Sequence, residues 1–408
     1  MGPRSAPNFS IVVLARDEAR ALPRLLHGLE EFAERGGEVL VVDTGSADDT
    51  IGTARALGCR VETVDARFDS VLNAAQEAEI ERRFAREAEG PMVAAGQRLF
   101  HFGDARQRAG LLASNRFVLQ LDARDEVPAL DVDAFDRWIA SSGAARFEYH
   151  QHYGNVGLRI ARFYDRTRYQ WQGRVHEILS PTASADAAPL IRCEPTQLVV
   201  RHHKDEGRPR TYLAGLALQV LERPDAPRWW HYLGRELFYQ CWYRSAIGVL
   251  ESHAAMDNAW AAERSQSLCY IGQCLEVLGS PDEATAAYRR ALALEPARRE
   301  PLLRLASAHC RRGEFEPAAE YASQSLAIPR TSAYPELEAN YTWMPHSLLY
   351  WSLFWSGRRD EARAHWEAYR ALAPEAALTR EHARLFPPAR PEPQNAAPVG
   401  SSTSPATP

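Results

Sequence analysis

Lysine is nearly absent from this sequence of 408 residues. Lys204 is the only lysine, so almost all of the 48 basic side chains are arginines, and these are spread along the whole chain. The formal net charge is -5, and no run of basic residues occurs. The sequence therefore lacks the electrostatic footprint of a nucleic-acid-binding protein, and we expect no nucleic-acid partner.

Long apolar runs are also missing. Nowhere do eighteen apolar residues follow one another, so we expect no transmembrane segment. The first apolar run, residues 11–15, is too short for a signal peptide. The six cysteines contain no Cys-x-x-Cys pair, which favours buried free thiols in a reducing compartment. Together these absences predict a cytoplasmic protein.

A third absence concerns the glycines of a dinucleotide-binding motif. Strand patterns at residues 9–14, 38–43 and 60–64 alternate with helical spacing, which predicts a parallel sheet with right-handed crossovers. A dinucleotide-binding domain would carry Gly-x-Gly-x-x-Gly after the first strand. Residues 15–17 are Ala-Arg-Asp instead, so the sequence excludes that motif.

Acidic residues follow two of the predicted strands. Asp43 ends the apolar run that begins at residue 38, and Asp122 ends the strand predicted over residues 117–121. In open α/β sheets, ligands bind at the carboxyl ends of the parallel strands. Asp43 is therefore a candidate contact for a nucleotide base or ribose, although the same strand-Asp-turn pattern is also typical of a plain helix N-cap.

The order of these parts resembles a family 2 glycosyltransferase of GT-A fold. The resemblance rests on the opening strand with its acidic loop, on Val-Asp-Thr-Gly-Ser at residues 42–46, and on Ala105-Arg106 sixteen residues before Asp122. It covers roughly the first 200 residues. It implies an α/β domain with a Rossmann-like mixed sheet over residues 1–207. Residues 70–98 within it are charged and rich in alanine, which predicts a helical insertion.

The resemblance also implies ligands and site residues. Such an enzyme binds a nucleotide-diphosphate sugar, most simply a UDP-sugar, and uses Mn²⁺ or Mg²⁺ to neutralise the departing diphosphate. The donor would contact Ala15, Arg16, Glu18, Asp43, Thr44, Gly45, Arg106 and Asp122. The metal would be held by Asp122, Asp125 and His202.

One position departs from the family pattern. The family usually shows Asp-x-Asp, whereas Arg124 stands where the second Asp is expected. Either the loop is one residue longer and Asp125 or Glu126 completes the site, or Arg124 itself supplies positive charge to the phosphates. A third interpretation is that these acids only cap a helix predicted around residues 131–141.

A Gly-x-Val-His-Glu segment at residues 173–177 looks like the acceptor side of the same family. Glu177 would be the general base, because inverting transfer requires a carboxylate on the acceptor oxygen. His176 would order the site or help to bind phosphate. A purely structural His-Glu pair is an equal alternative.

Histidines gather on two further strand patterns. Residues 146–153 alternate, which places three potential ligands on one strand face, either as a metal or acceptor site or as a polar wall of the cleft: Glu148, His150 and His152. The adjacent His202 and His203 end the domain and point to opposite faces of a strand, so only one of them can serve the site. The sequence does not say which.

Beyond residue 207 the composition changes to helix and the chain repeats itself. Small residues recur after turn-like pairs at Ala246, Ala284, Ala318 and Ala362. This spacing predicts an all-α domain of tetratricopeptide-like (TPR-like) repeats over residues 208–386. Such arrays form concave surfaces that bind peptides or proteins. Residues 387–408 are rich in proline and are expected to be disordered.

The sequence therefore predicts an inverting glycosyltransferase that moves a sugar from a nucleotide-diphosphate donor to a protein, peptide or glycan acceptor presented with help of the repeats. The alternative is a non-catalytic scaffold with a degenerate glycosyltransferase domain and a protein-binding repeat array, and Arg124 favours it. The sugar, the nucleotide, the acceptor and the oligomeric state are left open. For the enzyme, we expect Asp122→Ala to abolish donor hydrolysis with little change in melting temperature.

Overall fold

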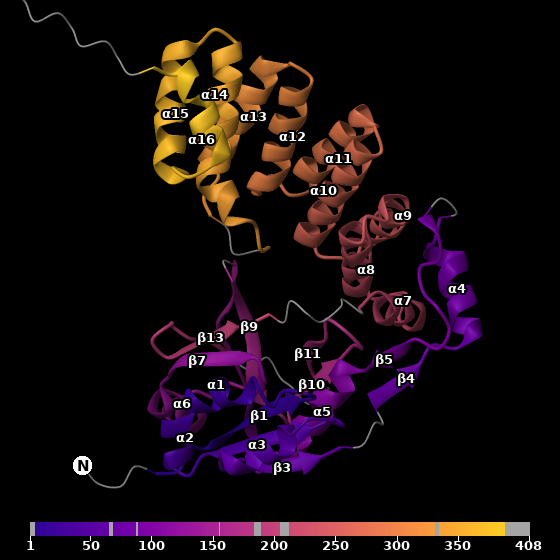
Figure 1. Cartoon of the computed structure of the whole chain (residues 1–408), viewed down its shortest axis with the longest axis vertical. Coiled ribbons are helices and arrows are strands. Elements are labelled where there is room, and N and C mark those ends of the chain that lie inside the picture. The colour runs from indigo at the N-terminus through magenta and orange to yellow at the C-terminus, as the bar shows by residue number, and fades with distance from the viewer. Residues whose placement is uncertain are drawn as a thin grey trace, which may run out of the picture.

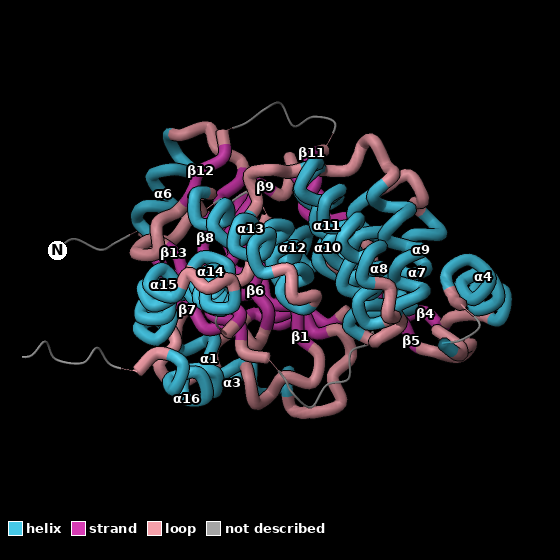
Figure 2. The backbone as a smooth tube through the Cα atoms, turned by 90° about the horizontal axis from the view of Figure 1, so that it is seen from above, coloured by secondary structure: helices cyan, strands magenta, loops and turns pink. Residues whose placement is uncertain are grey.

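The computed structural model describes residues 5–64, 68–86, 89–154, 156–182, 189–204, 212–330 and 334–387. A sheet domain at the N-terminal end is followed by a curved array of helices that arches over it (Figure 1). Seen from above, the array runs across the sheet domain from α7–α9 at one end to α14–α16 at the other (Figure 2). The predicted boundary at residue 207 and residues 388–408 of the predicted tail lie outside the described residues.

The sheet domain is built on a nine-stranded mixed sheet in the order β3-β2-β1-β6-β9-β8-β13-β7, with β12 paired to β8. The first four strands are parallel, as the sequence predicted, and β9 runs antiparallel to β6. The strands of this sheet are β1 (Phe9–Ala15), β2 (Glu38–Asp43), β3 (Arg60–Thr63), β6 (Phe117–Asp122), β7 (Asp125–Leu130), β8 (Arg146–Tyr153), β9 (Val156–Asp165), β12 (Leu190–Arg192) and β13 (Leu198–His202).

Helices cover both faces of this sheet. Phe9, Ile11 and Val13 of β1 pack with helical residues such as Leu25 on one face. On the other face, Val12 packs with residues of α5. This two-sided burial explains why β1 and β2 are apolar runs rather than alternating patterns. The helices of the sheet domain are α1 (Leu22–His27), α2 (Glu30–Glu34), α3 (Thr50–Ala56), α5 (Phe102–Leu112) and α6 (Val132–Ser141).

The predicted helical insertion is partly a strand pair. Within and beside residues 70–98 the structure has β4 (Asp69–Val71), α4 (Ala74–Phe84) and β5 (Arg98–Phe100), with β4 and β5 antiparallel. Ile80 and Phe84 of α4 share a hydrophobic core with residues of the helical array. The insertion therefore joins the two parts of the molecule. A second small sheet pairs β10 (Tyr169–Gln172) with β11 (Ile178–Pro181).

The C-terminal region consists of antiparallel helix pairs with TPR-like spacing. Four pairs follow α7, and the predicted alanines Ala246, Ala284, Ala318 and Ala362 are fully buried in their second helices. The helices are α7 (Tyr212–Glu222), α8 (Pro227–Tyr239), α9 (Tyr243–Ala254), α10 (Ala261–Val277), α11 (Pro281–Leu294), α12 (Arg299–Arg311), α13 (Phe315–Ala327), α14 (Trp343–Trp355), α15 (Arg359–Leu372) and α16 (Ala377–His382), with short 3-10 turns η3 (Glu338–Tyr341) and η4 (Ala383–Leu385).

Close helix contacts explain the glycines of the repeat. A Cβ at Gly234 would lie 2.4 Å from Cγ of Leu250, and one at Gly272 would lie 2.2 Å from Cε1 of Tyr288. The paired helices therefore approach each other only because these residues have no side chain. Cys241 has a positive φ of 63° at the turn where the next two repeats use Gly279 and Gly313. Cys241 is exposed, so the expectation of buried thiols is wrong at this position.

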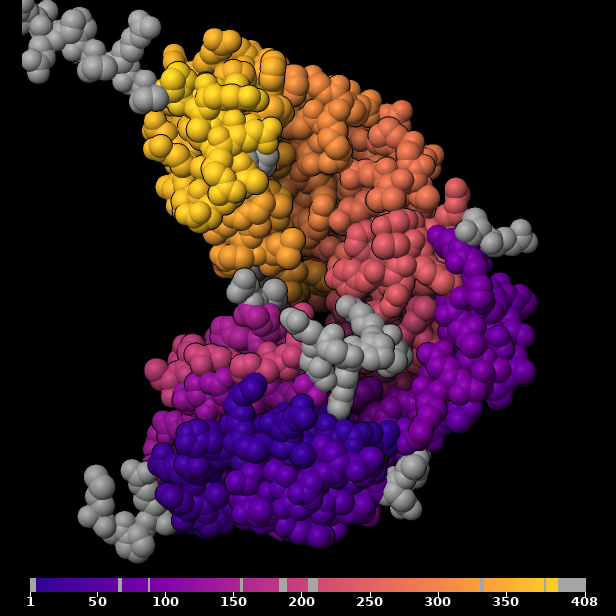
Figure 3. Space-filling view, in the orientation of Figure 1, coloured from indigo at the N-terminus to yellow at the C-terminus, as the bar shows by residue number. Residues whose placement is uncertain are grey.

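Among the described residues, no helix has both the length and the apolar character needed to cross a membrane. The space-filling view shows a broad hollow on one side, between the last repeats and the sheet domain (Figure 3).

Candidate functional site

The sheet register brings the predicted acids to one edge. Ala15 of β1 pairs with Asp43 of β2, and Leu14 pairs with Asp122 of β6. Since the three strands are parallel, Ala15, Asp43 and Asp122 all lie where a carboxyl end opens into a loop. Asp43 and Asp122 are two strands apart, or about 10 Å at the usual strand spacing.

The loops after β1 and β2 are fastened to each other. Thr44 donates its backbone N–H to the carbonyl of Ala15 at 3.0 Å, and its hydroxyl bonds the same carbonyl. Arg16 donates Nε to the carbonyl of Thr44 at 2.8 Å. Gly45 has a φ of +97°, which a residue with a side chain adopts only under strain. The predicted donor contacts of these two loops therefore form one rigid corner beside the sheet.

The carboxylate of Asp43 is used within its own turn. One oxygen accepts from the N–H groups of Gly45 at 3.0 Å and Ser46 at 3.2 Å, and the other accepts the Ser46 hydroxyl. Asp43 is 1% exposed. This is the local turn-stabilising role that the sequence left open as an alternative, so contact of the Asp43 carboxylate with a nucleoside stays a prediction.

Four buried or half-buried charged residues meet next to this corner: Arg106, Asp122, Arg162 and Glu177, which we call the charged cluster. Arg106 donates Nε to Oε1 of Glu177 at 2.6 Å and Nη2 to Oδ1 of Asp122 at 2.5 Å. Arg162 donates Nη1 to Oδ2 of Asp122 at 2.7 Å. Four segments of the chain, α5, β6, β9 and the segment before β11, are thus joined in one ion-pair chain. The predicted Arg106, Asp122 and Glu177 do lie together.

Two arginines dominate the electrostatics of Asp122. Burial raises the pKa of a carboxyl group, but Arg106 and Arg162 outweigh it and hold the pKa of Asp122 well below its usual range. Removing this carboxylate would leave Arg162 without its ion-pair partner and Arg106 with Glu177 alone, and breaking such a buried pair typically costs about 3–5 kcal/mol. The expectation that Asp122→Ala leaves the melting temperature nearly unchanged is therefore withdrawn.

One hydrogen-bond donor of Arg106 has no partner among the described residues. Arg106 is 4% exposed, and this donor, Nη1, is buried. An unsatisfied buried donor costs about 1–3 kcal/mol, so native structures rarely keep one without a reason. The backbone carbonyl of Arg106 accepts from Nε2 of Gln120 at 2.7 Å, which fixes this turn of α5 against β6.

Asp125 and His202 extend the cluster. They are register partners on the antiparallel strands β7 and β13, and His202 Nδ1 lies 2.8 Å from Oδ1 of Asp125. The other oxygen of Asp125 accepts the backbone N–H of Asp122 at 2.8 Å. Asp125 is fully buried, and burial raises its pKa against the opposing effect of His202. Of the two adjacent histidines, His202 is therefore the one that faces the site.

The predicted metal ligands are close enough to share an ion. One ligand atom from each of Asp122, Asp125 and His202 lies within 4.8 Å of the others. Two carboxylates and an imidazole are donors suited to a divalent cation such as Mn²⁺. Each oxygen of Asp122 accepts one arginine and retains a second lone pair. The residues therefore fit a metal, while metal binding itself stays a prediction.

The acids around Arg124 have separate roles. Arg124 Nε lies 3.0 Å from Oε2 of Glu18, which is 7% exposed, so Glu18 is paired with this guanidinium. Glu126 accepts from His203 at 2.8 Å and from Arg201 at 3.2 Å, and it does not join the charged cluster. Asp125 rather than Glu126 thus takes the place beside Asp122. The cap of α6 is Asp131, which accepts from Ala134 at 2.9 Å.

The segment that carries Glu177 is held by the helical array. Arg174 donates its backbone N–H to Oε1 of Gln219 on α7, at 2.7 Å. A Cβ at Gly173 would lie 2.7 Å from Cζ2 of Trp229 on α8, and Gly173 has a φ of +97°. His176 has a positive φ of 49°, and its ring stacks on Tyr232 with centroids 4.1 Å apart. His176 therefore faces the repeats, whereas Glu177 faces the sheet.

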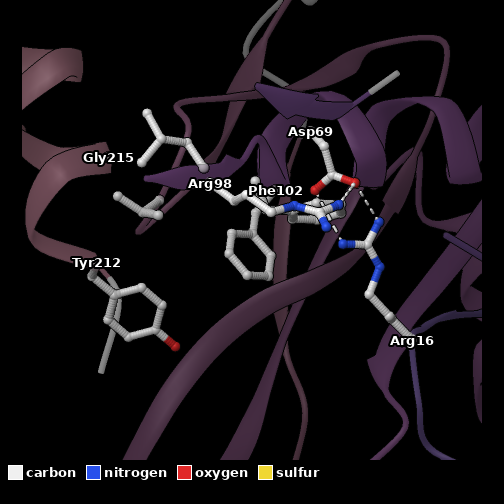
Figure 4. Close-up of a pocket in the computed structure, with 9 residues that line it drawn as sticks. Arg16, Asp69, Arg98, Phe102, Tyr212 and Gly215 are labelled. Carbon is white, nitrogen blue, oxygen red and sulfur yellow. Dashed lines mark hydrogen bonds and ion pairs between the residues drawn. The ribbon is translucent and has the colours of Figure 1, made fainter. Parts of the chain in front are cut away.

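A small cavity lies beside this junction. Its volume is about 170 Å³, and its lining comprises Arg16, Asp69, Arg98, Leu99, Phe100, Phe102, Val175, Tyr212 and Gly215. Arg16 and Arg98 approach the carboxylate of Asp69 from two directions, and Tyr212 lies on the opposite side (Figure 4). Phe102 begins α5 one turn before Arg106, and Val175 is two residues before Glu177. Two residues that line the cavity thus belong to the same segments as Arg106 and Glu177, although no residue of the charged cluster lines it.

Sequence reasoning missed several residues of the site. Arg162 lies on β9, and Gln151 of β8 approaches Oδ1 of Asp125 at 3.4 Å. Tyr149 is fully buried on the same face of β8 as Gln151. The alternation of β8 was correctly predicted. The polar face that was proposed there as a ligand site, however, is the face opposite Gln151. The signal for the correct side was an uncharged Gln at a core position.

No protein-family model matches the chain. Solved structures that are similar to part of it include PilF of Pseudomonas aeruginosa, at 17% identity over 42% of this chain and 72% of that chain, with a TM-score of 0.36. MamA is 16% identical over 44% of this chain and 86% of that chain, with a TM-score of 0.33. TTC0263, a TPR protein of Thermus thermophilus, is 20% identical over 43% of this chain and 89% of that chain, with a TM-score of 0.30. Likeness at this level carries no functional argument.

Proposed function

We propose that the chain is an inverting glycosyltransferase that uses a nucleotide-diphosphate sugar, with a UDP-sugar as the first candidate donor. The observation that carries the proposal is the meeting of Arg106, Asp122 and Glu177 at the carboxyl edge of the parallel strands. Group transfer needs a cation for the departing diphosphate and a carboxylate for the acceptor hydroxyl. The charged cluster supplies both kinds of group within one ion-pair chain.

Arg106 is suited to the donor. Its unpaired Nη1 is fixed by the two ion pairs that its other nitrogens make, so it donates without reorganising when a phosphate oxygen arrives. Arg162 supplies a second positive charge on the other side of Asp122. The diphosphate gains negative charge as the bond to the sugar breaks, and these guanidinium groups stabilise that charge.

Asp122, Asp125 and His202 are the residues that would hold a divalent cation. When bound there, such a cation would supply Lewis-acid stabilisation of the leaving diphosphate. Gln151 and the backbone of Asp122 orient the Asp125 carboxylate, and this kind of support fixes ligand geometry at metal sites.

Glu177 is suited to the acceptor. Arg106 holds its Oε1, which leaves Oε2 without a hydrogen-bond partner among the described residues. Oε2 takes the proton of the acceptor hydroxyl while the hydroxyl oxygen forms a bond to the anomeric carbon. The bond from that carbon to the diphosphate breaks on the opposite face, so the configuration inverts. The strained φ of 49° at His176 is consistent with a segment shaped by function rather than by local preference.

Thermal shift with UDP, GDP and dTDP, each with and without Mn²⁺, tests the donor site. A ligand that binds only the folded state stabilises it by mass action, by about 2.7 kcal/mol at a hundredfold excess over Kd. We expect one nucleotide to raise the melting temperature in a Mn²⁺-dependent way, and Asp125→Asn to remove that dependence. Arg290→Gln is the matched control, because Arg290 is an exposed arginine of α11 that pairs with Glu251 of α9 and makes no contact with the charged cluster among the described residues.

A non-catalytic scaffold remains the second candidate, and one observation favours it. All four carboxylate oxygens of Asp43 and Asp122 already accept hydrogen bonds from within the protein. A degenerate site would keep such pairs for stability alone. A scaffold predicts that none of the three nucleotides raises the melting temperature. Such a result would contradict the transferase proposal.

A further inference from the structure

The face of α8 that looks toward the Glu177 segment carries alternating cations and aromatic rings. Arg228, Tyr232, Arg235 and Tyr239 follow one another at intervals of four, three and four residues, so they form one stripe along the helix. Arg228 donates Nε to the carbonyl of His176 at 3.2 Å. The first residue of the stripe therefore contacts His176, which is next to Glu177 in the chain.

Arg235 has no polar partner in this stripe. Its guanidinium carbon lies 4.2 Å from the ring centre of Tyr232 and 6.0 Å from that of Tyr239. No hydrogen bond or ion pair of Arg235 occurs among the described residues. Glu263 of α10 lies 4.0 Å from Nη1 of Arg228, and it does not pair with Arg235. A half-buried cation is thus held between ring faces with its donors unused.

The surroundings of Arg235 are built from tyrosines. Tyr232, Tyr334, Tyr270 and Tyr239 are close enough to raise the pKa of Arg235, against the opposing effect of burial. Tyr239 and Tyr270 approach each other through their hydroxyls at 3.3 Å, and Tyr239 is 48% exposed. Aromatic faces hold a guanidinium in place by cation–π attraction while leaving its in-plane N–H groups for another acceptor. These N–H groups match the planar oxygens of a carboxylate.

We propose that this stripe docks an acidic segment of a polypeptide acceptor, with a carboxylate on Arg235. The role as an acceptor site rests on the proposed transferase function. The occupant follows from charge complementarity, because an unpaired guanidinium among phenols selects an anion. Its polypeptide nature follows from the repeat array, since stacked helical pairs present an extended surface that suits an extended chain.

The position of the stripe suits it to guide an acceptor toward Glu177. The ring of Tyr232 stacks on His176 and lies under Arg228 and Arg235. An acceptor anchored on Arg235 would run along the stripe toward His176 and present a neighbouring hydroxyl to Glu177. Arg228 and Arg235 are seven residues apart on α8, or about 10 Å along the helix axis, and an extended chain covers about 3.3 Å per residue, so the acid would stand at least about three residues from the modified hydroxyl.

Fluorescence anisotropy tests the inference without any donor. The probes are a labelled peptide of Glu, Ser and Thr, the same peptide with Gln for Glu, and a labelled oligogalacturonate. We expect the Glu peptide to bind the wild-type chain, Arg235→Gln to weaken binding tenfold or more, and Arg235→Lys to retain most of it. Arg290→Gln, whose arginine is paired on another surface, should bind as the wild type does.

Each other outcome overturns the inference. Equal binding of the Glu and Gln peptides, or binding to Arg235→Gln within twofold of the wild type, would remove the carboxylate anchor. Binding of the oligogalacturonate alone would make the occupant an anionic saccharide. Because no donor is present, a failure here is separate from a failure of the transferase, which donor turnover by the wild-type chain measures independently.

Discussion

Each of the two regions contains a buried arginine, and the two arginines differ in whether all of their guanidinium nitrogens donate a hydrogen bond. Arg298 in the helical array is 1% exposed, and each of its guanidinium nitrogens donates a hydrogen bond, with Glu336, Gln266 and the carbonyl of Ala262 among the acceptors. Arg106 in the sheet domain is 4% exposed and leaves Nη1 without a partner among the described residues. Full satisfaction marks an arginine that serves the fold. A missing partner calls for another explanation, and for Arg106 we propose a ligand.

The hydrogen-bond partners of the two arginines also lie in different kinds of place. Those of Arg298 come from α10 and from the segment before η3, so this arginine ties an insertion onto the repeats. Those of Arg106 come from β6 and from the segment before β11, where strands end at the candidate site. The comparison therefore predicts that changes in the first network reduce stability alone, and that changes in the second reduce activity as well.

The largest expected effect is on turnover. Glu177→Gln removes the charge that takes the acceptor proton but keeps an oxygen for Nε of Arg106. General-base catalysis contributes about 10²–10⁴-fold, so transfer should fall by about 10³-fold. Kinetics with the donor that the nucleotide screen identifies would measure this, and the melting temperature serves as the control. Transfer at near the wild-type rate would show that Glu177 is not the base.

The next effect is on stability in the repeats. Arg298→Met leaves Glu336 buried without its cation, which should cost about 3–5 kcal/mol of unfolding free energy. Arg290→Met on the exposed surface should cost less than about 1 kcal/mol. Denaturant unfolding monitored by tryptophan fluorescence compares the two. Equal small losses would mean that the Arg298 network is not a structural tie.

Acid should weaken the repeats between pH 6.5 and 4. Burial lowers the pKa of His253 to about 4 from an ordinary value of 6.5, so the unfolded chain binds its proton first as pH falls. The stability contributed by neutral His253 is complete above pH 6.5 and is lost between pH 6.5 and 4, by about 3 kcal/mol at most. Asp122 contributes stability fully above its ordinary pKa of 3.8, and because its pKa in the folded chain is lowered, this contribution is lost as pH falls below that value, beneath the window of His253.

Calorimetry at several pH values between 7 and 4 checks this window. His253→Gln, which cannot titrate, should show a smaller loss of stability over the same range. If the variant loses stability as steeply as the wild type, the titration of His253 is not the cause.

The smallest effect concerns the joint between the two regions. Gly173→Ala adds a methyl group that meets Trp229 and strains a φ of +97°, which together should cost about 1–3 kcal/mol and displace Glu177. Gly96→Ala is the matched control, because its φ of +87° is similar and nothing lies within 4 Å of the added methyl. Turnover and melting temperature are compared for both. Equal turnover in the two variants would show that the Trp229 contact does not position Glu177.

The sequence predicted the parallel strands and the repeats because both leave strong one-dimensional patterns. It did not predict β7, since this strand contains Pro128 and two acids and lacks an apolar run. Proline is tolerated there because β7 is the last strand in the sheet order, where a missing N–H costs no ladder bond. The pairing of Asp125 with His202 depends on that strand, so the sequence suggested these residues without the reason that joins them.

Other features of the site had no local signal at all. Nothing near Arg162 in the sequence indicates that it reaches Asp122, 40 residues earlier in the chain. The direction of the Asp43 carboxylate was equally open, because a strand-Asp-turn pattern does not say whether the acid bonds a ligand or its own loop. Side-chain partners across a sheet are set by packing, and packing is not periodic in the sequence.

Hydrolysis of a panel of radiolabelled nucleotide sugars in Mn²⁺ tests the central claim most directly, with the wild-type chain and Asp125→Asn compared. Asp125 makes three hydrogen bonds, with His202, Gln151 and the backbone N–H of Asp122, and Asn keeps one acceptor oxygen but lacks the charge. We expect the wild type to hydrolyse at least one donor and Asp125→Asn to be slower by about 10²-fold or more, as for loss of one electrostatic contact in an active site. An intact wild-type chain that turns over none of the donors, or an Asp125→Asn variant as fast as the wild type, would contradict the account.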